Sequence, residues 1–213
     1  MTEYIVEGEK WQLNFLLKSY FDFAEIQNGN LELITTEIIQ PENDIDLEMF
    51  SFDLLRLKIE YLSGLDKTEP IQFEIIDKNT IICNEEQLRI LSWACDLISR
   101  IKLCQFDHIA DIVTPIDDPK FRKLHQFRKD LDSLKSYWGL SSSSYFGIFS
   151  SKVSDSARTL WDMHQVIRNR LAYDANPGVT PQNRWEMKKF TVDFDEPFHA
   201  NEKVPLIKIK KKD

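Results

Sequence analysis

The sequence SDSARTLWDMHQVIRNRLAYDANP, residues 154–177, decides the fold prediction, because its apolar side chains recur at helical spacing. Ser154 is a favourable N-cap, and Asp155 places negative charge in the first turn. An Asn-Pro-Gly sequence that begins at Asn176 stops the helix. We therefore predict a helix from about Asp155 to about Tyr173.

One broad face of this helix combines apolar side chains with a histidine and an arginine. Residues three and four apart are neighbours on a helix, which places on this face Ala157, Leu160, Trp161, His164, Ile167, Arg168 and Leu171. An unpaired buried cation is costly, so His164 and Arg168 need partners. We expect either a structural network, closed by Asp162, Asp174 or a residue of another helix, or a cleft that binds an anion.

A second helix is predicted from Asn84 to about Cys104. Asn84 is a suitable N-cap, and Gln87 stands at the capping-box position. The helix carries two neighbouring apolar stripes, which are Leu88, Leu91, Cys95 and Ile98, and Ile90, Ala94, Leu97 and Ile101. Such a wide apolar arc is typical of a central, buried helix.

The far end of this second helix carries a charged side chain, Arg100. An ion pair with Asp96, one turn earlier, is the structural interpretation. The functional alternative is that Arg100 and Gln105 join His164 and Arg168 around one polar pocket.

The fold class predicted from the whole chain is α+β and mostly α, with a helical bundle over residues 84–175 and short flanking strands or hairpins. The other predicted helices are residues 9–25, 105–113 and 120–137, and the predicted strands are 31–40, a hairpin over 70–83, 190–194 and 204–210. Residues 49–62 fit either a strand or a helix, and a helix is preferred. Residues 1–69 are interpreted as an acidic extension or a small α/β module, and residues 70–213 as the helical core domain with a C-terminal strand segment. The final sequence KIKKKD is interpreted as a frayed tail.

Composition and charge are those of an ordinary globular protein. The 213 residues are 42% hydrophobic and 29% charged, and no apolar run approaches the roughly 20 residues that span a bilayer. The N-terminus lacks the features of a signal peptide, so we predict a cytoplasmic protein without membrane contact. Net charge is −8, and residues 1–67 hold 14 acidic and 5 basic side chains. This acidity disfavours binding to duplex DNA. It indicates either a solvated surface or an acidic patch that binds a basic partner or mimics nucleic acid.

Residue types that usually mark metal, redox or phosphate sites are few or scattered. The three cysteines form no CxxC pair, and the four histidines have no second ligand at helical spacing, so we expect buried thiols and no metal. The chain has only six glycines and contains none of the glycine-rich phosphate motifs. No cofactor is therefore predicted.

One local pattern, Arg168-Asn169 followed by Tyr173, resembles the R-N-x-x-x-H motif of HEPN-domain ribonucleases. These are helical bundles whose Arg and His act on RNA phosphodiesters, often across a dimer, so the resemblance implies an RNA substrate and a homodimer. The last position departs from the motif. Tyr173, with an ordinary pKa of about 10, is a poor general base at neutral pH.

A wider resemblance runs over roughly residues 80–209. The blocks NEEQLRILSWACDLISRI (84–101), CQF (104–106), SYFGI (144–148), DMHQVIRNRLAYD (162–174), VDFDEPF (192–198) and PLIKI (205–209) are similar, in this order, to a group of uncharacterised proteins of bacteriophages and prophages. The resemblance implies a phage-derived protein, and it does not imply any particular activity.

Three hypotheses for the function follow, and the preferred one is not enzymatic. In the first, a phage or prophage protein binds a host protein. In the second, the chain is a HEPN-like ribonuclease or a degenerate relative. In the third, it traps a nucleotide signal, with cationic side chains on the phosphates and Trp161 or Tyr173 stacking on the base. The candidate binding residues for the last two are Arg100, Gln105, Trp161, His164, Arg168, Asn169, Arg170 and Tyr173.

Overall fold

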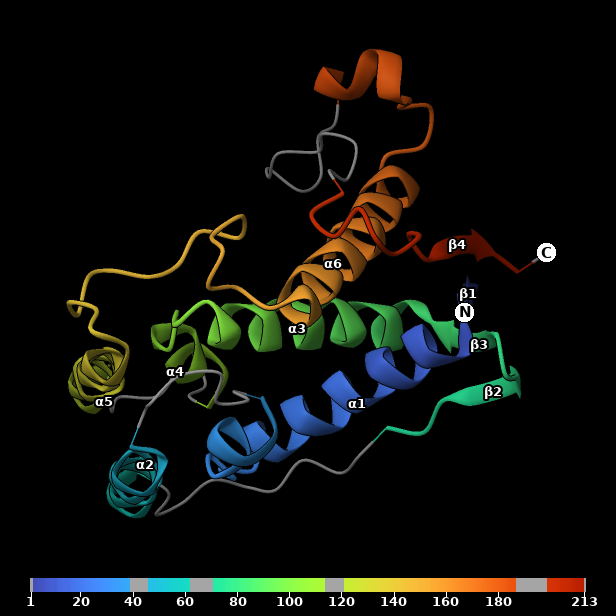
Figure 1. The fold of residues 1–213 in the computed structure, drawn as a ribbon. Helices are drawn as coiled ribbons and strands as arrows, with labels where there is room; N and C mark the ends of the chain where they lie inside the picture. The colour runs from blue at the N-terminus through green and yellow to red at the C-terminus, as the bar shows by residue number, and fades with distance from the viewer. Residues whose placement is uncertain (1, 39–45, 62–70, 114–120, 187–198, 213) are drawn as a thin grey trace. The chain divides into compact units, whose positions relative to one another are not determined.

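The computed structural model describes residues 2–38, 46–61, 71–113, 121–186 and 199–212 (Figure 1). Its α-helices are α1 Lys10–Gln27, α2 Leu47–Tyr61, α3 Glu85–Lys102, α4 Asp107–Val113, α5 Phe121–Ser133 and α6 Asp155–Ala175. Its strands are β1 Glu3–Glu7, β2 Glu74–Asp77, β3 Thr80–Asn84 and β4 Lys208–Lys211. A π-helix, Ile34–Ile38, and two 3₁₀ helices, Leu134–Trp138 and Pro181–Glu186, complete the regular structure of the described residues. The α+β, mostly α prediction is confirmed.

The chain forms two compact units. The first contains Met1–Tyr20, Ile71–Asp96 and Arg158–Asp213, and the second contains Phe21–Pro70 and Leu97–Ala157. Helices α1, α3 and α6 each contribute residues to both units. The domain boundary predicted near residues 66–70 lies outside the described residues.

The first unit is built on a four-stranded antiparallel sheet in the order β2-β3-β1-β4. In β1, Tyr4 and Val6 are buried and pair in register with Cys83 and Ile81 of β3. The hairpin predicted over residues 70–83 is confirmed as β2 and β3. β1 was not predicted, although its sequence EYIVE places a buried side chain at every second position.

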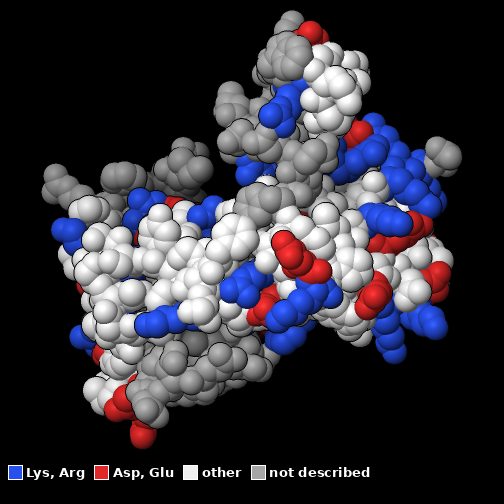
Figure 2. All heavy atoms as spheres, turned by 45° about the horizontal axis from the view of Figure 1, so that its top comes forward, with Lys and Arg blue, Asp and Glu red and all other residues white. Residues whose placement is uncertain are grey.

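Strand β4 confirms the strand predicted over residues 204–210 in its last part and corrects the interpretation of the C-terminal lysines as a frayed tail. β4 pairs with β1, with Lys210 opposite Ile5. Lys210 and Lys212 form ion pairs of 2.6 and 2.9 Å with Glu7 and Glu3. Figure 2 shows blue side chains beside red ones at this C-terminal end of the chain. The carboxylates of Glu3 and Glu7 therefore offset the mutual repulsion of the lysines in and after β4.

The helix starts follow the local signals in the sequence. Asn84 Oδ1 accepts the Gln87 N–H at 2.9 Å, and Gln87 Oε1 accepts the Asn84 N–H at 2.8 Å, which completes the predicted capping box of α3. Ser154 Oγ accepts the Ala157 N–H at 3.3 Å at the start of α6. Both predicted helices are confirmed in type and in approximate bounds.

In the second unit, the strand predicted over residues 31–40 is wrong for the described part of that range. Residues 34–38 form a π-helix, in which Ile34 and Ile38 are buried, and Leu31 in the preceding turn is buried as well. These apolar residues are three and four apart, and Thr35 Oγ1 donates to the Glu32 carbonyl at 2.9 Å. Helical spacing with a local hydrogen bond thus overrides the β-branched composition.

The core of the second unit centres on Phe50 of α2. The Phe50 ring lies 4.9 Å from Trp138, 5.4 Å from Tyr137 and 6.2 Å from Phe106, measured between ring centroids. Trp138 ends the 3₁₀ helix that follows α5, so the aromatic side chains join α2 to the region after α5. The helix predictions for residues 49–62, 105–113 and 120–137 are confirmed in the described parts of those ranges. The strand predicted at 190–194 lies outside the described residues.

Candidate functional site

The eight candidate residues are divided between the two units. Arg100 and Gln105 belong to the second unit, and the other six all lie on the part of α6 that belongs to the first. Those six are Trp161, His164, Arg168, Asn169, Arg170 and Tyr173.

In the second unit, Arg100 contacts side chains that follow the end of its own helix. Its Nη1 atom donates to Gln105 Oε1 at 2.9 Å and lies 3.3 Å from His108 Nε2. Cys104 adopts a positive φ of 60° in the intervening turn, and the Gln105 N–H donates to the Arg100 carbonyl. Arg100 and Gln105 thus form a local contact across the helix end, and the pocket that would join them with His164 and Arg168 stays a prediction.

In the first unit, His164 is buried against α3, with 8% of its surface exposed. Its Nδ1 atom lies 3.0 Å from both the hydroxyl and the backbone carbonyl of Ser92. Its Nε2 atom lies 3.9 Å from the Asp96 carboxylate, one turn further along α3. His164 therefore has the structural partners on another helix that the first interpretation required.

Ser92, His164 and Asp96 have the residue types of a hydrolytic triad but a different geometry. A carbonyl oxygen only accepts, so the contact with the Ser92 carbonyl places a proton on His164 Nδ1. A protonated Nδ1 cannot take the proton of the Ser92 hydroxyl, as a general base must. Ser92 is also buried. These contacts stabilise the packing of α6 against α3, and they do not activate Ser92 as a nucleophile.

Arg170 is engaged by Asp174 on the same helix. Two hydrogen bonds, of 2.8 and 3.0 Å, join the guanidinium to the two carboxylate oxygens. Lys211 of β4 lies 3.3 Å from the same carboxylate, and Tyr4 of β1 is hydrogen-bonded to it. Burial, followed by the Asp174 charge, raises the pKa of Tyr4 to about 12. Asp174 therefore joins α6 to two strands of the sheet.

The remaining candidates are half-buried on α6. The Trp161 ring lies 6.0 Å from the His164 ring, and Arg168 and Tyr173 follow further along the same helix. Among the described residues, no group accepts a hydrogen bond from Asn169 Nδ2, although that atom is buried. The HEPN-like pattern is thus carried on one continuous helix.

Asp162 has a role other than the one that sequence reasoning considered. It was expected as a partner of His164 or Arg168, but its two carboxylate oxygens accept the backbone N–H groups of Ala200 and Asn201 at 2.7 and 2.9 Å. Asn201 in turn donates its side-chain amide to Thr159 at 2.8 Å. Asp162 thus fixes the segment that leads to β4.

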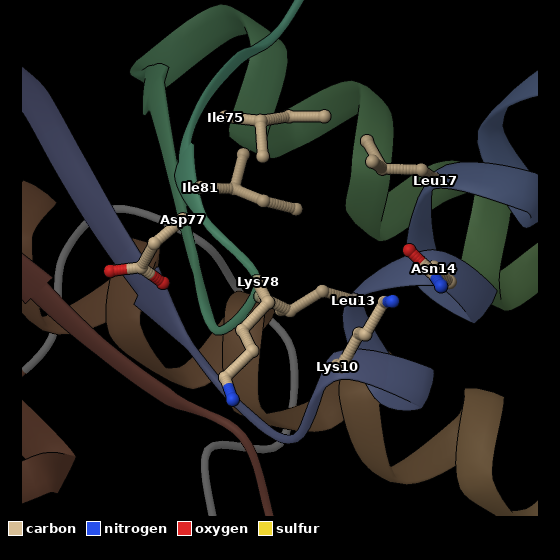
Figure 3. Close-up of a pocket in the computed structure, with 8 residues that line it drawn as sticks. All are labelled: Lys10, Leu13, Asn14, Leu17, Ile75, Asp77, Lys78 and Ile81. Carbon is tan, nitrogen blue, oxygen red and sulfur yellow. The ribbon is translucent and has the colours of Figure 1, made fainter.

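A second candidate region, missed by sequence reasoning, lies between α1 and the β2-β3 hairpin (Figure 3). It is a pocket of about 170 Å³, lined by Lys10, Leu13, Asn14, Leu17, Ile75, Asp77, Lys78 and Ile81. Ile75 and Ile81 extend from the hairpin toward α1, where Leu17 and Asn14 face them. The apolar floor and the two lysines suit a ligand with an apolar group and a negative charge. No local sequence signal marks this pocket, because it forms only where the hairpin packs against α1.

The three thiols offer little reactivity. Cys83, Cys95 and Cys104 are all buried, as predicted, and burial raises the pKa of each to about 12. Within the described ranges, no three His, Cys, Asp or Glu side chains are grouped so that they could hold a metal ion. No helix in the same ranges has the length and apolar character needed to cross a bilayer.

Comparison with known proteins finds no matching family model, no matching curated protein and no matching solved structure. The function must therefore be inferred from the residues and geometry of the chain itself.

The His164 contacts predict a stability effect. We expect His164→Ala to lower the free energy of unfolding by about 1–3 kcal/mol, because it removes a buried ring and its hydrogen bond to α3. Gln165→Ala, at the next position of α6, is the matched control and should change it by less than about 0.5 kcal/mol. Urea denaturation measures both. Equal stability of the two variants would show that His164 is not a structural anchor.

Proposed function

We propose that this chain is a phage- or prophage-encoded protein that acts by binding a host protein non-covalently. The proposed origin rests on the ordered sequence blocks between residues 80 and 209. The proposed binding role rests on the surface of the first unit.

The observation that carries the binding role is the exposure of two consecutive isoleucines in β2. Ile75 is 60% exposed and Ile76 is 53% exposed, and consecutive strand residues point to opposite faces. β2 has charges at both ends, Glu74 and Asp77, and an irregular register between Ile75 and Asp77, which are features that discourage pairing, but its two central residues are apolar and exposed. An edge that presents isoleucine on both faces favours a partner that covers it.

The two alternative functions depend on α6, and the contacts there support them less well. His164 and Arg170 are held by Ser92 and Asp174, which leaves fewer cationic groups for a phosphate. The position of a catalytic histidine in the HEPN pattern is occupied by Tyr173. Protein binding is therefore the function that the geometry supports best.

Affinity purification from bacterial cells that express the tagged chain tests this function. We expect a stoichiometric protein partner with the wild-type chain and with Arg168→Ala. The double variant Ile75→Lys/Ile76→Lys should lose this partner, because two charges replace the exposed apolar pair. A partner lost with Arg168→Ala and kept by the double variant would contradict the assignment to β2, and nucleotide or RNA assays would then take priority.

A further inference from the structure

β2 is an edge strand of the sheet in the described residues, and the segment that leads into it, residues 71–73, is fixed by contacts with α1 and α3. The Ile71 N–H donates to the Tyr20 hydroxyl, and Gln87 Nε2 donates to the Gln72 carbonyl at 2.7 Å. The Phe73 ring packs edge-on against Tyr20, with a centroid distance of 5.0 Å and an interplanar angle of 78°. A strand that adds to β2 therefore meets a fixed template, and less ordering entropy is lost on binding.

The pocket lies on one face of this edge. Ile75 of β2 pairs with Ile81 of β3, and both line the pocket together with Leu13 and Leu17 of α1. A fifth strand beside β2 would point every second side chain to this same face. The pocket of about 170 Å³ is similar in size to the roughly 150 Å³ apolar cavity that accepts benzene, so it has room for one large apolar side chain.

The charges around the pocket favour an acidic occupant. Lys10 and Lys78 line it from α1 and from the hairpin turn (Figure 3). The third charged residue of the lining, Asp77, accepts the Asn79 N–H at 2.7 Å within the turn. A carboxylate that follows or precedes the apolar side chain on the same face would be attracted to the two lysines.

The same charges disfavour a second copy of the chain as the occupant. Antiparallel pairing of β2 with its own copy over the whole strand would place Glu74 opposite Asp77 at both ends. Like charges directly opposite each other destabilise a strand pair. A different acidic segment with its carboxylates on the pocket face meets Asp77 of β2 but not Glu74, and Lys10 and Lys78, which line the pocket together with Asp77, offset that repulsion.

We propose that β2 binds an extended acidic segment of the partner as a fifth strand, with one apolar side chain in the pocket and carboxylates beside Lys10 and Lys78. This inference rests on the protein-binding function proposed above and specifies how the partner is recognised. Backbone hydrogen bonds would supply affinity, and the pocket with its lysines would supply specificity.

Synthetic peptides test the mode of binding without the natural partner. The acidic probe is the N-acetylated peptide Gly-Thr-Asp-Thr-Ile-Thr-Asp-Thr-Gly, in which the Ile and both Asp side chains share one face of a strand. A basic probe replaces both Asp by Lys, and a truncated probe replaces Ile by Ala. Chemical shifts of the backbone amides of the ¹⁵N-labelled full chain report binding at each position.

We expect the acidic probe to shift the amides of β2 and of the pocket residues, and the basic and truncated probes to bind at least tenfold more weakly. The variant Lys10→Glu/Lys78→Glu should reverse the preference in favour of the basic probe. The matched control is Lys18→Glu, which reverses the charge of an exposed α1 residue that does not line the pocket. This variant should keep the wild-type preference for the acidic probe.

Three results would overturn the proposal. They are the absence of amide shifts in β2 at millimolar acidic probe, equal binding of acidic and basic probes, and a concentration-dependent dimer that occupies β2 in the free chain. If these occur while the purified partner is still lost with Ile75→Lys/Ile76→Lys, strand addition is rejected and the binding function stands. If the acidic probe binds as expected but no partner is found, the binding mode stands and the host-protein function is rejected.

Discussion

Replacing Phe50 by alanine is expected to lower the free energy of unfolding by about 3–5 kcal/mol, the usual range for a buried phenylalanine. Phe50 is 0% exposed and contacts Phe106, Tyr137 and Trp138. The substitution removes these ring contacts and leaves a cavity that the surrounding rings cannot fill without moving. The second unit should lose most of its stability.

Phe52, two residues along the same helix, supplies the matched control. It is 64% exposed, so Phe52→Ala should change the free energy of unfolding by less than about 0.5 kcal/mol. Urea denaturation of both variants, followed by circular dichroism, gives the comparison. A loss of similar size in both variants would show that the aromatic cluster around Phe50 is not the core of the second unit.

The parts of the fold that the sequence predicted well are those specified by neighbouring residues. The start of α3 depends on Asn84 and Gln87, which are three positions apart and satisfy each other's backbone N–H groups. The start of α6 depends on Ser154 in the same way. Such signals need no knowledge of distant residues, and they were interpreted correctly.

The N-terminal strand β1 could not be predicted in this way, because its stability comes from partners far along the chain. β1 lies between β3 and β4, and Val6 meets Ile81 on one side and Ile209 on the other. The alternation over residues 204–210 did predict a strand there, but the lysines at its end were interpreted as frayed, because their partners Glu3 and Glu7 lie far away in the sequence. The strand prediction for residues 31–38 was wrong for a different reason, since their composition favours a strand while the spacing of their apolar residues is helical.

The candidate site shows the same division between local and distant information. Sequence reasoning correctly required partners for His164, and two polar residues one turn apart on α3, Ser92 and Asp96, supply them. The apolar stripes of α3 gave no reason to choose these two residues over the nearby Asp162. The pocket beside β2 was missed because it depends on how the hairpin packs against α1, which periodicity does not specify.

Replacing Asp162 by alanine is expected to lower the free energy of unfolding by about 2–4 kcal/mol. The substitution leaves the buried N–H groups of Ala200 and Asn201 without an acceptor, and each such group costs about 1–3 kcal/mol. Asp162→Asn keeps one acceptor oxygen and should cost about half as much. Glu202→Ala, an exposed carboxylate in the same segment, is the matched control and should cost less than about 0.5 kcal/mol.

The pH dependence of the Asp162→Asn effect tests the environment of this carboxylate. Burial raises the pKa of Asp162 above its ordinary value of 3.8, and the two backbone N–H groups and His199 oppose this shift only in part. The unfolded chain therefore loses the Asp162 proton first, so the contribution of Asp162 to stability is full below pH 3.8 and falls as pH rises through the raised pKa. The stability difference between wild type and Asp162→Asn should shrink over this window and then stay constant. A stability difference that grows with pH would mean that the hydrogen bonds from the two N–H groups lower the pKa of Asp162 more than burial raises it. The folded state would then favour the ionised form of Asp162.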